Sequence, residues 1–429
     1  MSLLVIMGSG ETAPTMVKVH RRVFDAAGEG PSLLLDTPYG FQGNADDLSE
    51  RAVAYFADVA SRVVTPLRWR VPDPSAADRA TAALRSARWA FAGPGSPTYA
   101  LRVWAGSGID AEVAAVVERG GASVFASAAA LTLGSHTVPV YEVYKVGEEP
   151  AWREGLGILE RVTGITAAVV PHWDNNEGGN HDTRFCYLGE RRLEKLEADL
   201  PDGVGVLGVD EHTALLIDPG AGHAVVDGRG TVTARYRETQ TVWDAGAIIP
   251  MDALADALAG HVAGSGGASR GASRISSGHS ASRSEHSAAP PDVAAGDARS
   301  LREAADAGLA VFDDAVSTRD ADAATQAVLD LEAAIVDWSA DTEQSDDTDY
   351  ARRTLRAMVV RLGALARDGV SDPAERVEPF VTLLLARRDA ARDARDWPAA
   401  DAIRDGLTSV GIEVRDTADG VTWRLRDSS

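Results

Sequence analysis

Two hydrophobic patterns alternate along the first 261 residues of the chain. Short apolar runs typical of buried strands occur at 3–7, 32–36, 62–67, 89–92 and 122–126. Stretches with helical periodicity lie between them, including 15–27, 45–60 and 110–118. Regular alternation of strand and helix predicts an α/β domain in which a mostly parallel sheet is flanked by helices.

The pattern changes after Val204, where apolar runs follow one another more closely. These runs are VGVLGV, TALLI, HAVVD and TVTAR, all between residues 204 and 235. The dipeptide Asp227-Gly228, with Gly230 close behind, is typical of a tight turn. We therefore expect neighbouring strands here and a hairpin at this turn.

The remainder of the chain divides into two parts of different composition. Residues 262–296 are rich in Ser, Gly, Ala and Arg and almost lack large apolar residues, which predicts a disordered linker. Residues 297–429 show helical periodicity in four stretches and end in an alternating segment around Asp419-Gly420. We expect an α/β first domain over 1–261, the linker, and a separate α-helical bundle with a terminal hairpin over 297–429.

Charge and cysteine content narrow the possible functions. The 429 residues include 64 acidic and 42 basic side chains, a formal net charge of −22, which argues against a general binder of nucleic acid or anionic membranes. The single cysteine, Cys186, excludes an intramolecular disulfide and any metal site with several cysteines. No apolar run approaches the ~20 residues of a membrane span. A cytoplasmic protein with no membrane partner is expected.

Ser127 is the first candidate for chemistry. It follows the predicted strand ASVFA and precedes Ala128, Ala129 and Ala130. A nucleophile on a sharp strand-to-helix turn needs small neighbours, and such a turn exposes its hydroxyl at the carboxyl end of the sheet. The alternative interpretation is an ordinary serine N-cap of a helix.

A second cluster, VVPHWDNNEGGNHDTR, spans residues 169–184 and begins at a predicted strand end. It contains His172 and His181 together with Asp174, Glu177, Asp182 and Arg184. Histidine is the usual base that activates a serine. A surface histidine, or a metal site built from His172, His181 and a carboxylate, remains an alternative, although the spacing of helical zinc sites is absent.

Two further segments could complete such a site. Glu211 lies between two apolar strands, where a carboxylate could orient the imidazole of a Ser–His pair, or it is an exposed loop acid. Gly93 and Gly95 follow a strand, and their backbone amides could stabilise an oxyanion. The chain contains no phosphate-binding GxxxxGK[ST] motif, and no cofactor is predicted.

The N-terminal 250 residues resemble the serine peptidases typified by aspartyl dipeptidase (dipeptidase E) and cyanophycinase. The resemblance rests on four segments in order: Gly93–Thr98, the turn at Ser127, Pro171–Leu193 and Gly208–Ile217. It implies a fold like that of class I glutamine amidotransferases and a triad with Ser127 as nucleophile, His172 as base and Glu211 as its orienting acid. It also implies an oxyanion hole at Gly93, Gly95 and Ala128, and substrate contacts from His181 and Arg184.

The turn around the serine departs from the family pattern G-x-S-x-G. Phe125 stands at the first glycine position and Ala129 at the second. A large side chain at the first position suggests a different turn or altered activity. A catalytically degenerate peptidase fold that serves as a binding module is therefore the alternative to a serine-type hydrolase acting on a short peptide or an acidic amide.

The last fifty residues resemble the C-terminal end of cysteinyl-tRNA synthetases. Residues 384–425 carry the pattern R-x-x-x-R-x-x-x-D-[FW]-x-x-A-D-x-[IL]-R-D-x-L with the later G-I and G-x-x-W. The synthetase catalytic signatures are absent, so aminoacylation is not expected. The resemblance implies possible tRNA contact, with Arg387, Arg388, Arg392 and Arg395 as a phosphate-contacting stripe.

The charge of the C-terminal part favours another role for it. Residues 297–429 contain 17 arginines, no lysine and 28 acids. This excess of negative charge opposes the electrostatic attraction that supplies most tRNA affinity. A packing bundle, including a possible homodimer, is therefore the alternative to tRNA contact.

Overall fold

A computed structural model describes residues 2–176, 178, 181–261, 300–318, 320–340, 346–368, 373–417 and 420–426. Its contacts divide the chain into two compact units: Met1–Ser300 with Val336–Asp346, and Leu301–Ile335 with Asp347–Ser429. The predicted linker over 262–296 lies outside the described residues. Each unit is described below by itself.

The first unit contains an eight-stranded sheet with the order β14-β11-β10-β1-β5-β4-β2-β3. Its parallel part consists of β1 (Leu3–Met7), β2 (Ser32–Leu35), β3 (Val64–Pro66), β4 (Trp89–Ala92) and β5 (Ala122–Ala126). Its antiparallel part consists of β10 (Thr213–Asp218), β11 (His223–Gly228) and β14 (Ile248–Pro250). The predicted α/β class is confirmed, and the sheet is mixed.

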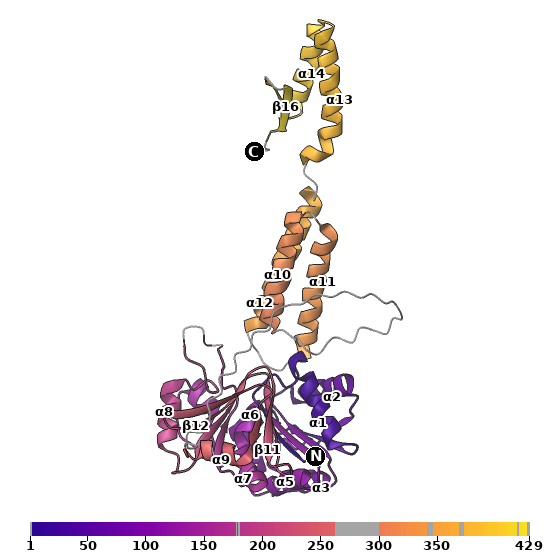
Figure 1. Cartoon of the computed structure of the whole chain (residues 1–429). Helices are drawn as coiled ribbons and strands as arrows, with labels where there is room; N and C mark the ends of the chain where they lie inside the picture. The colour runs from indigo at the N-terminus through magenta and orange to yellow at the C-terminus, as the bar shows by residue number, and fades with distance from the viewer. Residues whose placement is uncertain are drawn as a thin grey trace, which may run out of the picture. The chain divides into compact units, whose positions relative to one another are not determined.

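Helices cover both faces of this sheet, which explains the unbroken apolar runs of its strands. Side chains of β1 alternate between two cores: Val5 packs with α1 (Val17–Ala27) and α2 (Ala45–Ala60), and Ile6 packs on the opposite face. That opposite face is covered by α3 (Pro74–Leu84), α4 (Pro97–Trp104), α5 (Ile109–Glu118) and α7 (Ile158–Thr163). Figure 1 shows α1 and α2 on one side of the sheet and α3, α5 and α7 on the other.

A second sheet of the same unit has the order β13-β12-β9-β8-β6-β7. Its strands are β6 (His136–Thr137), β7 (Arg153–Glu154), β8 (Ala167–Val170), β9 (Gly205–Val209), β12 (Thr231–Tyr236) and β13 (Thr239–Asp244). Helix α8 (Glu190–Ala198) packs on one face, and α9 (Met251–Leu258) contacts β9 and β12. Because side chains of β8, β9 and β12 share a core with the first sheet, the two sheets form one body.

The hairpin predicted at Asp227-Gly228 is wrong. Strand β11 ends at Gly228 and pairs with β10 in the first sheet, whereas β12 pairs with β9 in the second. The backbone N–H of Arg229 donates to the carbonyl of His212 (3.0 Å), and the hydroxyl of Thr231 donates to Asp210 (2.8 Å). These bonds direct the chain from one sheet to the other. The hairpins of this region are instead β10–β11 and β12–β13.

The second unit is helical and ends in two paired strands, as predicted. Its helices are α10 (Leu301–Thr318), α11 (Ala321–Asp337), α12 (Asp346–Asp368), α13 (Pro373–Asp393) and α14 (Trp397–Ser409). Strands β15 (Ile412–Thr417) and β16 (Gly420–Leu425) form the terminal hairpin. Val381, Leu385 and Leu407 form a small core with the first residues of β15. Among the described helices of the whole chain, none has a long enough apolar stretch to cross a membrane.

Candidate active site

The turn after β5 places Ser127 at the carboxyl end of the first sheet. Helix α6 (Ser127–Ala130) begins at the serine itself, which has a left-handed backbone with φ of +50°. Such a backbone costs a non-glycine residue roughly 1–3 kcal/mol and persists where the surrounding structure fixes it. The following residues, Ala128 to Ala130, are buried methyl side chains that let the helix start close to the sheet. The serine hydroxyl is directed at His172, unlike that of an N-cap serine.

Phe125 fits this turn without a glycine because its side chain is accommodated in the core. It is fully buried and packs in the core on the side of α4, where its ring lies 6.4 Å from that of Trp104. Ala92, Ala100 and Ala129 belong to the same core and leave room for the ring. The aromatic residue therefore fills core volume, and the backbone of the turn keeps its strained conformation.

His172 lies directly beyond β8 of the second sheet and is also left-handed, with φ of +48°. Its carbonyl accepts the backbone N–H of Cys186 (3.0 Å) and that of Asn175 (3.3 Å), which fixes the bend. Its Nε2 lies 2.8 Å from the Oγ of Ser127. With the proton on Nδ1, the imidazole is oriented to accept the serine proton at Nε2.

Glu211 lies between β9 and β10 and completes a row of three hydrogen-bonded side chains. Its Oε1 is 2.9 Å from Nδ1 of His172 and accepts a second hydrogen bond from Nδ2 of Asn175 at 2.9 Å. Burial raises the pKa of Glu211, but the hydrogen bonds from His172 and Asn175 outweigh burial and hold the pKa below its usual value. The carboxylate therefore stays ionised and holds the imidazole in one orientation.

Two more acids lie behind this row. Oδ1 of Asp174 accepts the backbone N–H of Glu211 at 2.7 Å. Burial, together with the nearby charge of Asp210, raises the pKa of Asp174 to about 6. Burial also raises the pKa of Asp210, against hydrogen bonds from Thr231. Asp174 thus holds the backbone of Glu211 in place, and the carboxyl group of Asp174 itself changes charge in the mildly acidic range.

The predicted oxyanion turn packs directly against the serine turn. The carbonyl of Gly93 accepts the backbone N–H of Ala129 at 3.2 Å. Gly95 has φ of +134°, and a Cβ there would lie 2.2 Å from the carbonyl oxygen of Pro38, so only glycine fits. Because Pro94 has no N–H, Gly93 and Gly95 are the residues of this turn that could donate to an oxyanion.

His181 and Arg184 differ from the triad residues in their exposure and in their contacts. His181 is exposed. Arg184 forms two hydrogen bonds of 2.9 Å with Asp182 and a longer ion pair with Glu190 (3.4 Å), and its side chain is half exposed. Their predicted role in substrate binding stays a prediction. Among the described residues, no group of three His, Cys, Asp or Glu side chains is arranged to hold a metal ion.

Asn175 is a site residue that the sequence did not lead us to name, and Asp174 was named only as one acid of the cluster. Both lie within three residues of His172, in the segment that was recognised as a cluster. Their contacts are with Glu211, 36 and 37 residues further along the chain. Their nearness to the candidate base was the signal that could have indicated them.

Comparison with known sequences identifies one segment of the second unit. Residues 378–424 match the family of the cysteinyl-tRNA ligase anticodon binding domain. The cysteine–tRNA ligase of Pseudarthrobacter chlorophenolicus is 38% identical over 87 residues, which cover 19% of this chain and 18% of that protein. That of Maricaulis maris is 46% identical over 56 residues, 13% of this chain and 12% of that protein. The chain thus spans less than a fifth of these relatives, and the C-terminal resemblance is confirmed.

The N-terminal part is similar to solved structures of peptidases. A peptidase from an acI-B1 Actinobacterium has a TM-score of 0.48 and 20% identity, covering 58% of this chain and 97% of its own. A putative peptidase E protein from Listeria monocytogenes EGD-e has a TM-score of 0.37 and 11% identity, covering 53% of this chain and 98% of its own.

Proposed function

We propose that the first unit is a serine-type hydrolase that cleaves short peptides or related amides. The observation that carries the proposal is the row of two hydrogen bonds, 2.8 Å from Ser127 to His172 and 2.9 Å from His172 to Glu211. Both bonds are short enough for proton transfer and for orientation of the imidazole. The buried setting of Ser127 and His172 strengthens these interactions.

In this mechanism, Ser127 attacks the substrate carbonyl while its proton passes to Nε2 of His172. Glu211 stabilises the imidazolium that forms. The backbone amides of Ala128, Gly93 and Gly95 stabilise the developing oxyanion. His172 then gives its proton to the leaving amine, and water releases the acyl group from Ser127 in a second cycle of the same steps.

A fluorophosphonate probe tests nucleophile activation without knowledge of the substrate. We expect the full chain to form a covalent adduct at Ser127, located by mass spectrometry of peptides. Ser127→Ala should abolish labelling, whereas Ser86→Ala, at an exposed serine, should leave it unchanged. A folded protein that is not labelled, or a Ser127→Ala variant that is still labelled, would refute the proposal.

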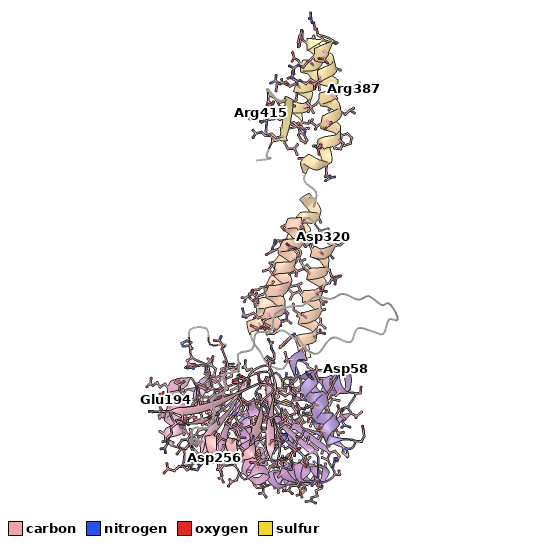
Figure 2. The ribbon with its side chains drawn as sticks, viewed as in Figure 1. Asp58, Glu194, Asp256, Asp320, Arg387 and Arg415 are labelled. Carbon is pink, nitrogen blue, oxygen red and sulfur yellow. The ribbon has the colours of Figure 1, made fainter. Side chains whose placement is uncertain are left out.

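We propose tRNA contact as a second candidate function, for the segment 378–424. Its support is the family match together with the exposed position of Arg387 on α13 and of Arg395 in the turn before α14 (Figure 2 labels Arg387). Arg388 does not belong to the predicted stripe: it is buried and makes two hydrogen bonds of 2.8 Å to Asp416. Arg392 pairs with the same carboxylate at 3.0 Å.

Filter binding of bulk tRNA to the full chain tests this second function. We expect saturable binding that weakens as salt rises, because each phosphate contact releases counterions. Replacing Arg387 and Arg395 together by alanine should weaken binding several-fold, whereas Arg79→Ala in the first unit should not. Absence of binding at low salt would refute tRNA contact and leave the self-association alternative.

A further inference from the structure

A cavity of about 510 Å³ in the first unit is not used by the proposed mechanism. Its lining includes Ser96, Thr98, Tyr99 and Arg102, from the segment that follows the oxyanion turn. Ser96 caps α4 and is three residues beyond Gly93. One side of the cavity is therefore continuous with the turn that contacts the serine turn.

The opposite side of the cavity comes from another part of the chain. It is formed by Tyr141 and Glu142, at the start of the π-helix η3 (Glu142–Val146). Within this element, the ring of Tyr144 lies 5.0 Å from that of Tyr187, which lies 6.1 Å from the imidazole of His172. The cavity is thus bounded by two segments: one follows Gly93, whose carbonyl accepts the N–H of Ala129, and the other packs through Tyr144 against Tyr187, a neighbour of His172.

Aromatic side chains form part of the wall of this cavity. Phe41 and Tyr141 are 50% and 41% exposed, more than is usual for such large rings, and both line the space. The ring of Phe41 lies 5.2 Å from that of Tyr99, whose hydroxyl is anchored by a hydrogen bond of 2.6 Å to the carbonyl of Arg70. The walls are therefore positioned before a ligand binds, which lowers the entropic cost of binding.

The charges around the cavity favour a ring over an acidic group. The guanidinium of Arg102 lies 4.7 Å from the centre of the Tyr99 ring and can stack on a further ring. Glu142 accepts a hydrogen bond of 3.1 Å from Thr98 and carries the opposite charge. Because one cation and one anion line the same space, the cavity offers no net attraction to a carboxylate.

We propose that this cavity is a specificity pocket for an aromatic side chain, carried by the residue that supplies the scissile carbonyl. The inference rests on the proposed hydrolase function and names its substrate class. The acyl residue is the one held at the oxyanion turn, so its side chain extends toward Ser96 and the aromatic walls. The preferred substrates are short peptides that are cut after phenylalanine, tyrosine or tryptophan.

Aminoalkyl phosphonate diphenyl esters test the pocket because they label an activated serine and carry a chosen side chain. We expect the probe with a phenylalanine side chain to label the full chain at least tenfold faster than the probes with leucine or glutamate side chains. The ratio of rate constants between probes cancels any change in the reactivity of Ser127 itself. Equal rates for the three probes would overturn the inference.

Variants of the exposed lining residues test whether the preference for the aromatic probe arises in this cavity. Phe41→Ala should reduce the phenylalanine-to-leucine ratio about tenfold, and Phe41→Tyr should restore it. Arg102→Gln should reduce the same ratio a few-fold, because a stacked cation favours a ring over an aliphatic chain. The control Val63→Ala, 82% exposed and outside the cavity lining, should leave the ratio unchanged. An unchanged ratio in Phe41→Ala, with an unchanged melting temperature, would overturn the assignment.

Failure of the inference and failure of the proposed function give different results. If the simple fluorophosphonate does not label Ser127, the hydrolase function is refuted, and the inference about the specificity pocket is refuted with it. If the fluorophosphonate labels Ser127 but the side-chain probes show no aromatic preference, the hydrolase function stands and the specificity pocket is refuted.

Discussion

Phe125→Ala tests whether the aromatic residue at the serine turn is part of the core or a mark of lost activity. Phe125 is fully buried and packs near Trp104. Truncation of a buried phenylalanine typically costs about 3–5 kcal/mol, which combines the lost transfer free energy and the cavity that remains. In a unit of this size, each kcal/mol lowers the melting temperature by about 2–4 °C, so we expect a fall of roughly 10 °C.

The assay combines thermal melting with probe labelling of the full chain. Melting followed by near-ultraviolet circular dichroism reports the loss of packing, and Val63→Ala, at an exposed valine, serves as the matched truncation with little expected change. Well below its melting temperature, Phe125→Ala should label with fluorophosphonate no faster than the wild type. An unchanged melting temperature together with faster labelling would show that the ring obstructs the site, and the core interpretation would be wrong.

Three other changes probe the surroundings of the triad. Asn175→Ala removes a hydrogen bond of 2.9 Å to an ionised carboxylate and should lower the labelling rate about tenfold, with no change if Asn175 has no positioning role. Gly95→Ala places a methyl group 2.2 Å from the carbonyl oxygen of Pro38 and should lower the melting temperature by several degrees; normal stability would contradict this. Asp174 has a pKa raised to about 6, so its contribution to stability is present below about pH 4 and is lost as the pH rises through 6. Asp174→Asn should flatten the dependence of unfolding free energy on pH in that window, measured by urea denaturation, and an unaltered slope would contradict the assignment.

Local sequence patterns predicted the elements, and the resemblance to the serine peptidases implied the triad. The run Leu3–Met7 is apolar at every position because helices cover both faces of its strand. The position of Ser127 at a turn was likewise predicted from the apolar strand that ends just before it. Both predictions depend only on residues that are close together in the sequence. The structure brings Ser127, His172 and Glu211 together, as the order of the motifs implied.

Features that depend on pairing over long distances were not predicted. Thr213–Asp218 is an apolar strand that would fit either sheet, and only its pairing with β1 assigns it to the first. The same limit applies to Arg388, which has the spacing of a phosphate-contacting residue. Its burial follows from Asp416 on β15, 28 residues away, and no local pattern encodes that contact.

The two sheets of the first unit carry different members of the candidate triad. Ser127 follows a strand of the first sheet, whereas His172 follows a strand of the second, and their hydrogen bond joins positions 45 residues apart. A small shear between the sheets would break this bond while the strands and helices of each sheet persisted. Serine reactivity therefore reports the docking of the two sheets, which far-ultraviolet circular dichroism would not detect.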